Sequence, residues 1–356
     1  MMEGREDRSG SLPDEGDVMI VSNVLPVKLE KDASTGKWSA SWDLDKVRMG
    51  APILHERVGA MTDWEGGFRY VGVPDVFVSR ADEAEVEQVL AELGCIPVFV
   101  DAECAHNHYQ GFCKGIIWPL FHNIIDLYNE APLSSAGTMS GPAEGGTGGA
   151  GGPASAGSGP SMSGLSRNRS RGQSEWKEAK SWNPRAVEQV WPDHCAFNMK
   201  FAMKIVQEYR PGDTIWVQDY HLLLLPSYLL RKLPRANVGL FLHIPFPSSE
   251  IFRNLSVREE ILRSMLSADH LGFHLYEYAR HFLTSCKRML GLTFETKEGG
   301  VLAVKYNGRR ILITCSHTGT NVETIKTRCS TDAVTNEYHR IQHTNVLFEE
   351  ARRHLV

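Results

Sequence analysis

The stretch TIWVQDYHLLLLPSYLLRKLPRANVGLFLH (residues 214–243) decides the fold of this 356-residue chain. It opens with the apolar run 214–217 and closes with the apolar run 238–243, and each predicts a buried strand. Between the two runs a helix is expected over about residues 222–231. A strand, a helix and a strand in this order need a crossover connection, so the stretch favours a parallel sheet.

The same alternation extends through the rest of the chain. Further strands are expected at residues 18–22, 68–72, 96–100 and 271–273, with helices at about 186–209, 257–266 and 276–290. A helix that starts near residue 79 carries Val86, Val89, Leu90 and Leu93 at helical spacing. The pair Asn307-Gly308 between two short apolar runs is typical of a type I′ hairpin turn. The predicted fold class is therefore α/β, with a doubly wound, Rossmann-like sheet.

Three segments lack the pattern of a folded core. Residues 1–17 are polar and are predicted to be a disordered tail, and residues 317–356 are predicted to be a divergent, poorly ordered tail. Residues 134–178 are rich in Gly and Ser and contain too few large apolar side chains to offset the entropy lost on ordering, which predicts a disordered insertion. The remainder of 18–316 is enough for one large domain.

Composition and charge exclude several classes of protein. The formal net charge is −5 with both signs mixed along the chain, so nothing supports nucleic-acid binding. No apolar run approaches the roughly 20 residues of a membrane span, and the N-terminus lacks the apolar region of a signal peptide. The seven cysteines form no C-x-x-C pair, which argues against disulfides or a zinc site and indicates a reducing, cytoplasmic location. We expect no metal and no cofactor.

Candidate site residues follow the predicted strands, because open parallel sheets bind ligands at the carboxyl ends of their strands. Asp219 could accept hydrogen bonds from two sugar hydroxyls, or it could cap the helix that follows, and the spacing favours neither. His243 could stabilise charge at a leaving phosphate or carry a proton, although a histidine there is more often structural. Tyr109 and Trp118 offer flat faces that can grip a sugar ring, unless both belong to the core.

Several motifs in fixed order resemble the trehalose-6-phosphate synthases, glycosyltransferase family 20. They are Val21-Ser22-Asn23, Gly111-Phe112, the run WPLFH at 118–122, Asp219-Tyr220-His221, the run HIPFPSSE at 243–250, Gly272-Phe273-His274 and the run YARHF at 278–282. The run KWSASWD at 37–43 further resembles the plant-type subgroup, whose members usually also carry a phosphatase-like domain. The resemblance is to the N-terminal half of these proteins.

The resemblance implies a GT-B glycosyltransferase, of which this chain would be the N-terminal, acceptor-binding lobe. The implied reaction is a retaining transfer of glucose from UDP-glucose to glucose 6-phosphate, without a metal or a covalent enzyme nucleophile. By position in the motifs, Tyr109, Trp118 and Asp219 would contact the acceptor sugar, and His243 would lie near the transferring glucose. Asp219 and His243 are thus the expected catalytic residues.

The chain also departs from the family's pattern. Val24 stands where active members usually have an arginine that would clasp the acceptor phosphate, and Gly36-Lys37-Trp38 replaces a Gly-Gly loop near the donor diphosphate. Gln218 and Ser256 stand where histidine and proline are common. The family's donor segments, Arg-Leu-Asp-x-x-Lys-Gly and Asp-Gly-Met-Asn-Leu-x-x-x-Glu, do not occur in the sequence.

These departures leave three interpretations open. The chain is a trehalose-6-phosphate synthase or a fragment of one, or a non-catalytic sugar-phosphate-binding partner that regulates active synthases, or the product of a truncated gene model. In each case we expect weak binding of glucose 6-phosphate, and binding of UDP-glucose only if a donor domain is supplied. The chain alone is expected to be inactive, because it is truncated before the residues that would stabilise the leaving UDP.

Overall fold

The computed structural model describes residues 16–43, 67–124, 184–296, 302–317 and 322–353. The chain forms two compact units, Met1–Ser316 and His317–Val356, each of which is described by itself. The predicted insertion at 134–178 and residues 1–15 of the predicted tail lie outside the described residues. Asp17, the last residue of that tail, is part of the fold, since its N–H donates to Asp213 Oδ1 at 3.0 Å and its carboxylate pairs with Arg69.

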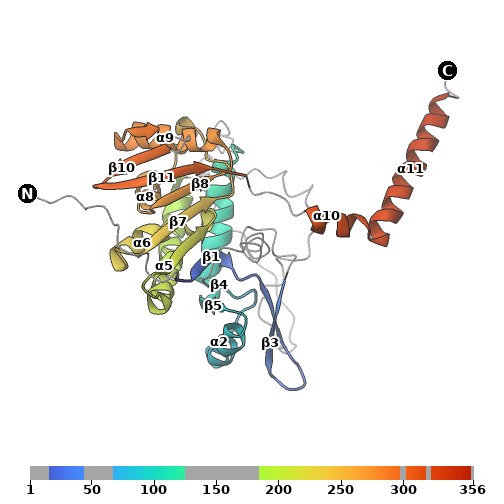
Figure 1. Ribbon diagram of the computed structural model, residues 1–356, viewed down its shortest axis with the longest axis horizontal. Coiled ribbons are helices and arrows are strands. Elements are labelled where there is room, and N and C mark those ends of the chain that lie inside the picture. Colours follow the sequence, from blue (N-terminus) through green and yellow to red (C-terminus); the bar gives the residue numbers. More distant parts are fainter. Residues whose placement is uncertain (1–15, 44–66, 125–183, 297–301, 318–321, 354–356) are drawn as a thin grey trace, which may run out of the picture. The chain divides into compact units, whose positions relative to one another are not determined.

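A nine-stranded sheet runs through the larger unit in the order β5-β4-β1-β6-β7-β8-β11-β10-β9 (Figure 1). In this order, each neighbouring pair from β5 through β4, β1, β6, β7 and β8 to β11 is parallel. Strands β10 and β9 then continue the sheet with antiparallel pairing. The strands are β1 Val18–Val24, β4 Phe68–Val73, β5 Cys95–Pro97, β6 Thr214–Gln218, β7 Asn237–Leu242, β8 His270–Phe273, β9 Phe294–Thr296, β10 Leu302–Tyr306 and β11 Arg309–Cys315. The predicted doubly wound parallel sheet is confirmed.

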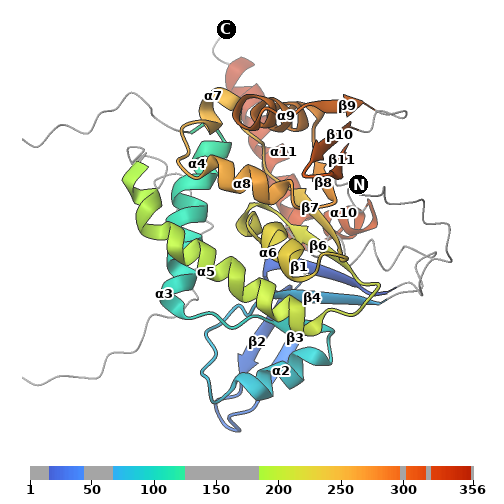
Figure 2. The same cartoon turned by 90° about the vertical axis from the view of Figure 1, so that its left-hand side faces the viewer.

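Strand β1 is buried on both faces because its apolar side chains alternate between two cores. Met19 and Val21 belong to the larger core, whereas Val18 and Ile20 belong to the smaller one. The larger core lies under α5 (Pro184–Glu208), α6 (Leu225–Lys232), α8 (Arg258–Met265) and α9 (Tyr276–Leu290), which lie together in front of the sheet in Figure 2. The smaller core lies under α2 (Glu83–Ala91) and a separate hairpin of β2 (Val27–Lys31) and β3 (Trp38–Trp42).

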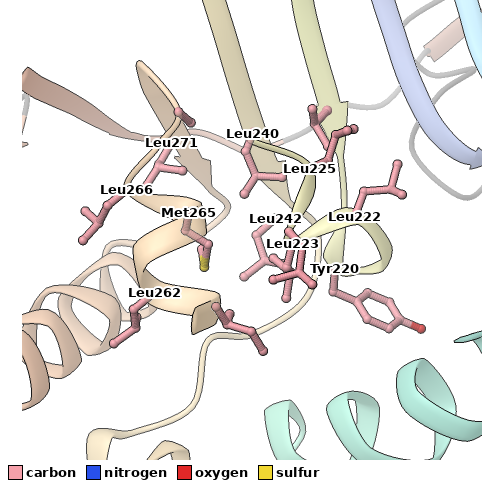
Figure 3. Close-up of a cluster of buried hydrophobic side chains, with 14 of the residues drawn as sticks. Tyr220, Leu222, Leu223, Leu225, Leu240, Leu242, Leu262, Met265, Leu266 and Leu271 are labelled. Carbon is pink, nitrogen blue, oxygen red and sulfur yellow. The ribbon is translucent and has the colours of Figure 1, made fainter. Parts of the chain in front are cut away.

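The connection from β6 to α6 is a dense apolar layer (Figure 3). Leu222, Leu223 and Leu225 belong with Leu240 and Leu242 of β7 to one hydrophobic cluster, and all five leucines are buried. The side chain of Tyr220 points away from these leucines. The remaining short elements among the described residues of this unit are α3 (Ala102–His106), the π-helix η2 (Asn107–Ile117), α4 (Trp118–Phe121), the 3₁₀ turn η5 (Tyr220–Leu222) and α7 (Ser249–Phe252).

Three elements differ from their predicted bounds by three or more residues at one end. The strand expected at 96–100 is the three-residue β5, which ends at Pro97, a residue with no N–H for a sheet ladder. The helix expected from residue 79 begins at Glu83. The helix expected at 222–231 is divided, because the chain first forms η5 and α6 then begins at Leu225.

The predicted hairpin after α9 is confirmed. Asn307 and Gly308 have φ angles of 50° and 74°, the positive values that a type I′ turn requires. They join β10 to β11 in antiparallel register, with Tyr306 opposite Arg309.

The smaller unit differs from the irregular tail expected from the sequence. It contains α10 (Val322–Cys329) and α11 (Asp332–Arg353). The segment from His317 onward has no proline and only Gly319, so nothing interrupts a helix there. Val334, Tyr338 and Ile341 stand at i, i+4 and i+7 and are exposed. None of the described helices in either unit combines the length and the apolar character that crossing a lipid bilayer requires.

Candidate active site

The candidate site lies where the strand order reverses direction. From β1 the sheet continues through β4 and β5 on one side and through β6, β7 and β8 on the other. Val24 ends β1, Asp219 follows β6 and His243 follows β7. Ligands of open α/β sheets bind in the crevice outside the carboxyl ends of strands at such a switch point. Two of the four predicted site residues, Asp219 and His243, are therefore at the expected end of adjacent strands.

Asp219 has a strained backbone. Its φ is 66° and its ψ is −176°, a conformation that is essentially restricted to glycine and costs a non-glycine residue on the order of 1–3 kcal/mol. The backbone is held by the Asp219 N–H, which donates to the carbonyl of Phe241 at 2.7 Å. Its side chain makes no capping hydrogen bond to η5, and Oδ1 instead accepts the backbone N–H of His243 at 3.2 Å. This geometry disfavours the helix-cap interpretation of Asp219.

Asp219 is only 9% exposed, and the protonation of its carboxyl is finely balanced. Burial raises its pKa to about 7, whereas the backbone N–H groups of Tyr220 and His243 and the charge of Lys114 lower the pKa. At neutral pH the group exists in both forms. As a carboxylate it can accept hydrogen bonds from two sugar hydroxyls.

The π-helix η2 supplies the aromatic side of the site. Tyr109 and Trp118 are half-buried, the Tyr109 ring stacks on His221 with centroids 5.8 Å apart, and the Trp118 ring is tilted against Tyr220 at 5.9 Å. Burial raises the pKa of Tyr109, and the charge of Asp219 raises it further. Tyr109 therefore lies within electrostatic reach of Asp219. The structure thus brings Tyr109 and Trp118 to the same region as Asp219.

Lys114 is a residue of this site that the sequence analysis missed. Its Nζ lies 3.9 Å from the centroid of the Trp118 ring and 5.8 Å from that of Tyr109. Burial lowers the pKa of Lys114, and the charge of Asp219 opposes that shift. The available signal was its spacing, five residues after Tyr109 and four before Trp118.

His243 is neutral around pH 7, because burial and the neighbouring His274 lower its pKa to about 4. Its Nε2 lies 2.9 Å from Gln218 Oε1, and a carbonyl oxygen only accepts, so Nε2 carries the proton. The lone pair of the ring is then on Nδ1. A neutral ring of this tautomer can accept a hydrogen bond from a hydroxyl and carries no positive charge.

A buried histidine chain lies beneath η2. His108 and His194 approach through their Nδ1 atoms at 2.9 Å, and His108 Nε2 lies 3.6 Å from Cys113 Sγ. The pKa of each histidine is lowered by burial, that of His194 to about 3. One donor atom each from His108, Cys113 and His194 lie within 4.8 Å of one another, as metal ligands would. In the described structure His108 faces these two neighbours through opposite ring nitrogens, Nδ1 towards His194 and Nε2 towards Cys113.

Comparisons with known proteins agree on one family. The model of glycosyltransferase family 20 matches residues 16–135 and 175–348 and omits most of the Gly/Ser-rich segment. A probable alpha,alpha-trehalose-phosphate synthase (UDP-forming) of Arabidopsis thaliana is 33% identical over 326 residues, which are 91% of this chain and 31% of the relative. The chain therefore spans less than a third of the length of this curated relative.

Solved structures show the same fold. The N-terminal domain of a Candida albicans trehalose-6-phosphate phosphatase has a TM-score of 0.59 and 23% identity, over 97% of this chain and 57% of that one. A Burkholderia xenovorans trehalose-phosphate synthase in complex with glucose-6-phosphate has a TM-score of 0.55 and 17% identity, over 90% and 55%. The expected fold, the N-terminal lobe of a GT-B glycosyltransferase, is thereby confirmed. From the family match and the plant relative, the chain belongs to glycosyltransferase family 20.

Proposed function

We propose that this chain is the acceptor-binding lobe of a trehalose-6-phosphate synthase-like protein and binds glucose 6-phosphate in the crevice beside Asp219. The observation that carries the proposal is the strained, buried Asp219 at the switch point of the sheet, beside two half-buried aromatic rings. The Burkholderia relative whose complex contains glucose-6-phosphate has the same fold, which supports this acceptor.

Each side chain has a chemically suitable part in holding a sugar. The Asp219 carboxylate would accept hydrogen bonds from two hydroxyls, and the rings of Tyr109 and Trp118 would pack on the apolar face of the sugar. Tyr220 Oη and His221 Nε2 are buried and have no hydrogen-bond partner within the described part of the chain. A polyhydroxyl ligand that reached them would satisfy groups that are costly to leave unpaired.

His243 would lie towards the transferring glucose. Its neutral ring and free Nδ1 lone pair suit a hydrogen bond from a glucose hydroxyl. In glucosyl transfer the departing UDP develops negative charge, and a neutral imidazole contributes little to its stabilisation. We therefore assign to His243 the orientation of the donor sugar.

Calorimetric titration of the purified chain tests acceptor binding. We expect saturable binding of glucose 6-phosphate, and no heat with UDP-glucose alone, because the residues expected to bind the donor are absent from this sequence. A chain that gives no heat with glucose 6-phosphate refutes the proposal.

Turnover is tested separately with UDP-glucose and glucose 6-phosphate together. We expect no trehalose 6-phosphate from this chain alone, whereas its appearance would show that a donor site exists within these 356 residues.

A second candidate function is a sugar-phosphate sensor that regulates active synthases. Val24 favours it, because the arginine that active members usually have at this position is replaced here by an aliphatic side chain. The similar Candida domain belongs to a protein described as a phosphatase, so the fold is not confined to proteins described as synthases. If the chain is such a partner, adding it to an active synthase should change the rate of that synthase, and glucose 6-phosphate should modulate the change.

We also infer a reducing, cytoplasmic setting. All seven cysteines are unpaired, and four of them, Cys95, Cys104, Cys113 and Cys286, are buried in the core. A reducing compartment preserves thiols of this kind.

A further inference from the structure

The proposed ligand carries a phosphate dianion, and the candidate site offers few cations to receive it. Val24 at the end of β1 is apolar. His243 has a pKa of about 4 and His221 a pKa of about 3, both lowered mainly by burial, so both rings are uncharged near pH 7. Among the described groups that act on the pKa of Asp219, Lys114 is the one cation.

Lys114 reaches the site because η2 is a π-helix. Hydrogen bonds in a π-helix run from residue i to i+5, so residues five apart lie on the same side, as Tyr109 and Lys114 do here. In an α-helix five residues span about 1.4 turns, which would place these two side chains on different faces. The wider turn therefore places Tyr109, Lys114 and Trp118 along one face of η2 and the start of α4.

The surroundings of Lys114 leave its charge available. The ammonium lies over two aromatic rings, which stabilise a cation without neutralising it. No carboxylate in the described ranges forms a salt bridge with Lys114 within 4.0 Å, although Asp219 is close enough to influence its pKa. By contrast, Lys200 and Lys204 on α5 each pair with a carboxylate. Partial burial removes part of the hydration of the Lys114 ammonium. A bound anion would compensate for that loss with a charge-assisted hydrogen bond.

We infer that Lys114 binds the phosphate group of the acceptor and is the specificity-determining residue that separates glucose 6-phosphate from glucose. The inference rests on the proposed function and adds to it the group that recognises the phosphate. Lys114, on the π-helix η2, would take the part that the aliphatic Val24 at the end of β1 cannot take. A purely structural Lys114 would instead serve only to cover the Trp118 ring.

The experiment compares Lys114→Met and Lys114→Arg with the wild-type chain. Methionine keeps the length and the apolar stem without the charge, and arginine keeps the charge. Glucose 6-phosphate, glucose and inorganic phosphate are titrated into each by calorimetry at low and high salt. Lys200→Met is the matched control, because it removes an ion-paired lysine on α5 that lies outside the proposed site.

We expect Lys114→Met to lose at least about tenfold in affinity for glucose 6-phosphate while its affinity for glucose stays unchanged. Lys114→Arg should retain most of the preference, and Lys200→Met all of it. The affinity of the wild-type chain for glucose 6-phosphate should fall with added salt, and that of Lys114→Met should not.

The outcomes separate the inference from the function on which it rests. If Lys114→Met binds glucose 6-phosphate as tightly as the wild-type chain, the inference is wrong and the proposed function stands. If the wild-type chain does not bind glucose 6-phosphate, both are wrong.

A second measurement needs no variant. Reductive methylation of the wild-type lysines, read out by mass spectrometry, should be slowed at Lys114 by glucose 6-phosphate but not by glucose, and equal rates with the two ligands would overturn the inference.

Discussion

At the scale of single residues, Asp219 stores free energy in two ways. Its backbone adopts a conformation that favours glycine, and its carboxyl is held where ionisation is unfavourable. Substitution can remove the backbone strain and the unfavourable ionisation, and a residue with a purely structural part would require neither of them. Asp219 therefore lowers the stability of the fold at a position that we assign to ligand binding.

Asp219→Asn should stabilise the fold and weaken ligand binding. The pKa of Asp219 rises from 3.8 to about 7 on folding, so the folded state binds the extra proton and stability is lost as the pH rises from about 4 to 7. Asparagine still accepts the His243 N–H without this penalty. The gain in the free energy of unfolding is expected to reach at most about 4 kcal/mol at pH 7.5 and to be about half as large at pH 5.5.

Urea unfolding of both proteins at the two pH values measures this difference. If the gain in the free energy of unfolding does not change with pH, the pKa of Asp219 is not raised on folding. Calorimetry with glucose 6-phosphate on the same samples should show weaker binding by the asparagine variant, because its Nδ2 donates where a carboxylate oxygen accepts and its remaining oxygen carries no negative charge.

At the scale of secondary-structure elements, the site depends on how closely η2 approaches α5. Gly111 on η2 faces Val190 of α5, and a Cβ built on Gly111 would lie 2.8 Å from Val190 Cγ1. The contact continues through Asn107, whose Nδ2 donates to Asp193 Oδ2 at 2.7 Å, and through the His108–His194 pair. Tyr109, Lys114 and Trp118 are positioned by this packing.

Gly111→Ala is therefore expected to push η2 away from α5. Valine is stiff at χ1 and cannot yield easily, so the cost should be about 1–3 kcal/mol. The affinity for glucose 6-phosphate should fall as well. Gly115→Ala is the control, because Gly115 is exposed on the same helix and a Cβ there would first meet the Gln110 carbonyl at 3.1 Å. Thermal melts of the two variants test the expectation, and equal melting temperatures would contradict it.

Most elements could be predicted because their signals are local. Strands β1, β6 and β7 are apolar runs between polar residues, and α9 shows a helical period over its whole length, Tyr276–Leu290. The strand-end rule then identified Asp219 and His243. The sequence analysis missed helix α11. Its apolar residues recur at helical spacing, but they have no buried partner in the described part of their own unit.

The remaining features depend on contacts between distant residues. We infer that packing on α5, Pro184–Glu208, decides whether residues 107–117 form an α-helix or a π-helix, and α5 lies far along the chain from η2. The position of Lys114 in the site follows from that choice. The His108–His194 contact joins residues 86 apart and has no local signal at all.

At the scale of the whole molecule, buried neutral histidines should govern stability in acid. Burial lowers the pKa of His194 and of His221 to about 3, and that of His108 well below its usual value. The unfolded chain takes up protons at these residues below about pH 6.5 and the folded chain does not, so stability falls as the pH falls. Asp219 has the opposite slope, but three histidines outweigh one aspartate.

We accordingly expect the free energy of unfolding to decrease between pH 7 and pH 5, by up to about 1.4 kcal/mol per pH unit for each histidine that remains neutral. Replacing both His108 and His194 by Phe should flatten this slope, since neither position then takes up a proton. The control variant is His339→Gln, at an exposed position of α11. A double variant with the wild-type slope would contradict the explanation.

Among the described residues, the nine-stranded sheet ends at both sides in very short strands, and this affects how copies of the chain can meet. The outermost strands, β5 and β9, have three residues each, and Pro97 in β5 has no N–H to donate. A strand from another molecule that aligned with either border would gain only one or two rungs of backbone pairing. The long apolar strands that would template a fibril lie in the middle of the sheet, so growth of cross-β aggregates from the native state is disfavoured at both borders.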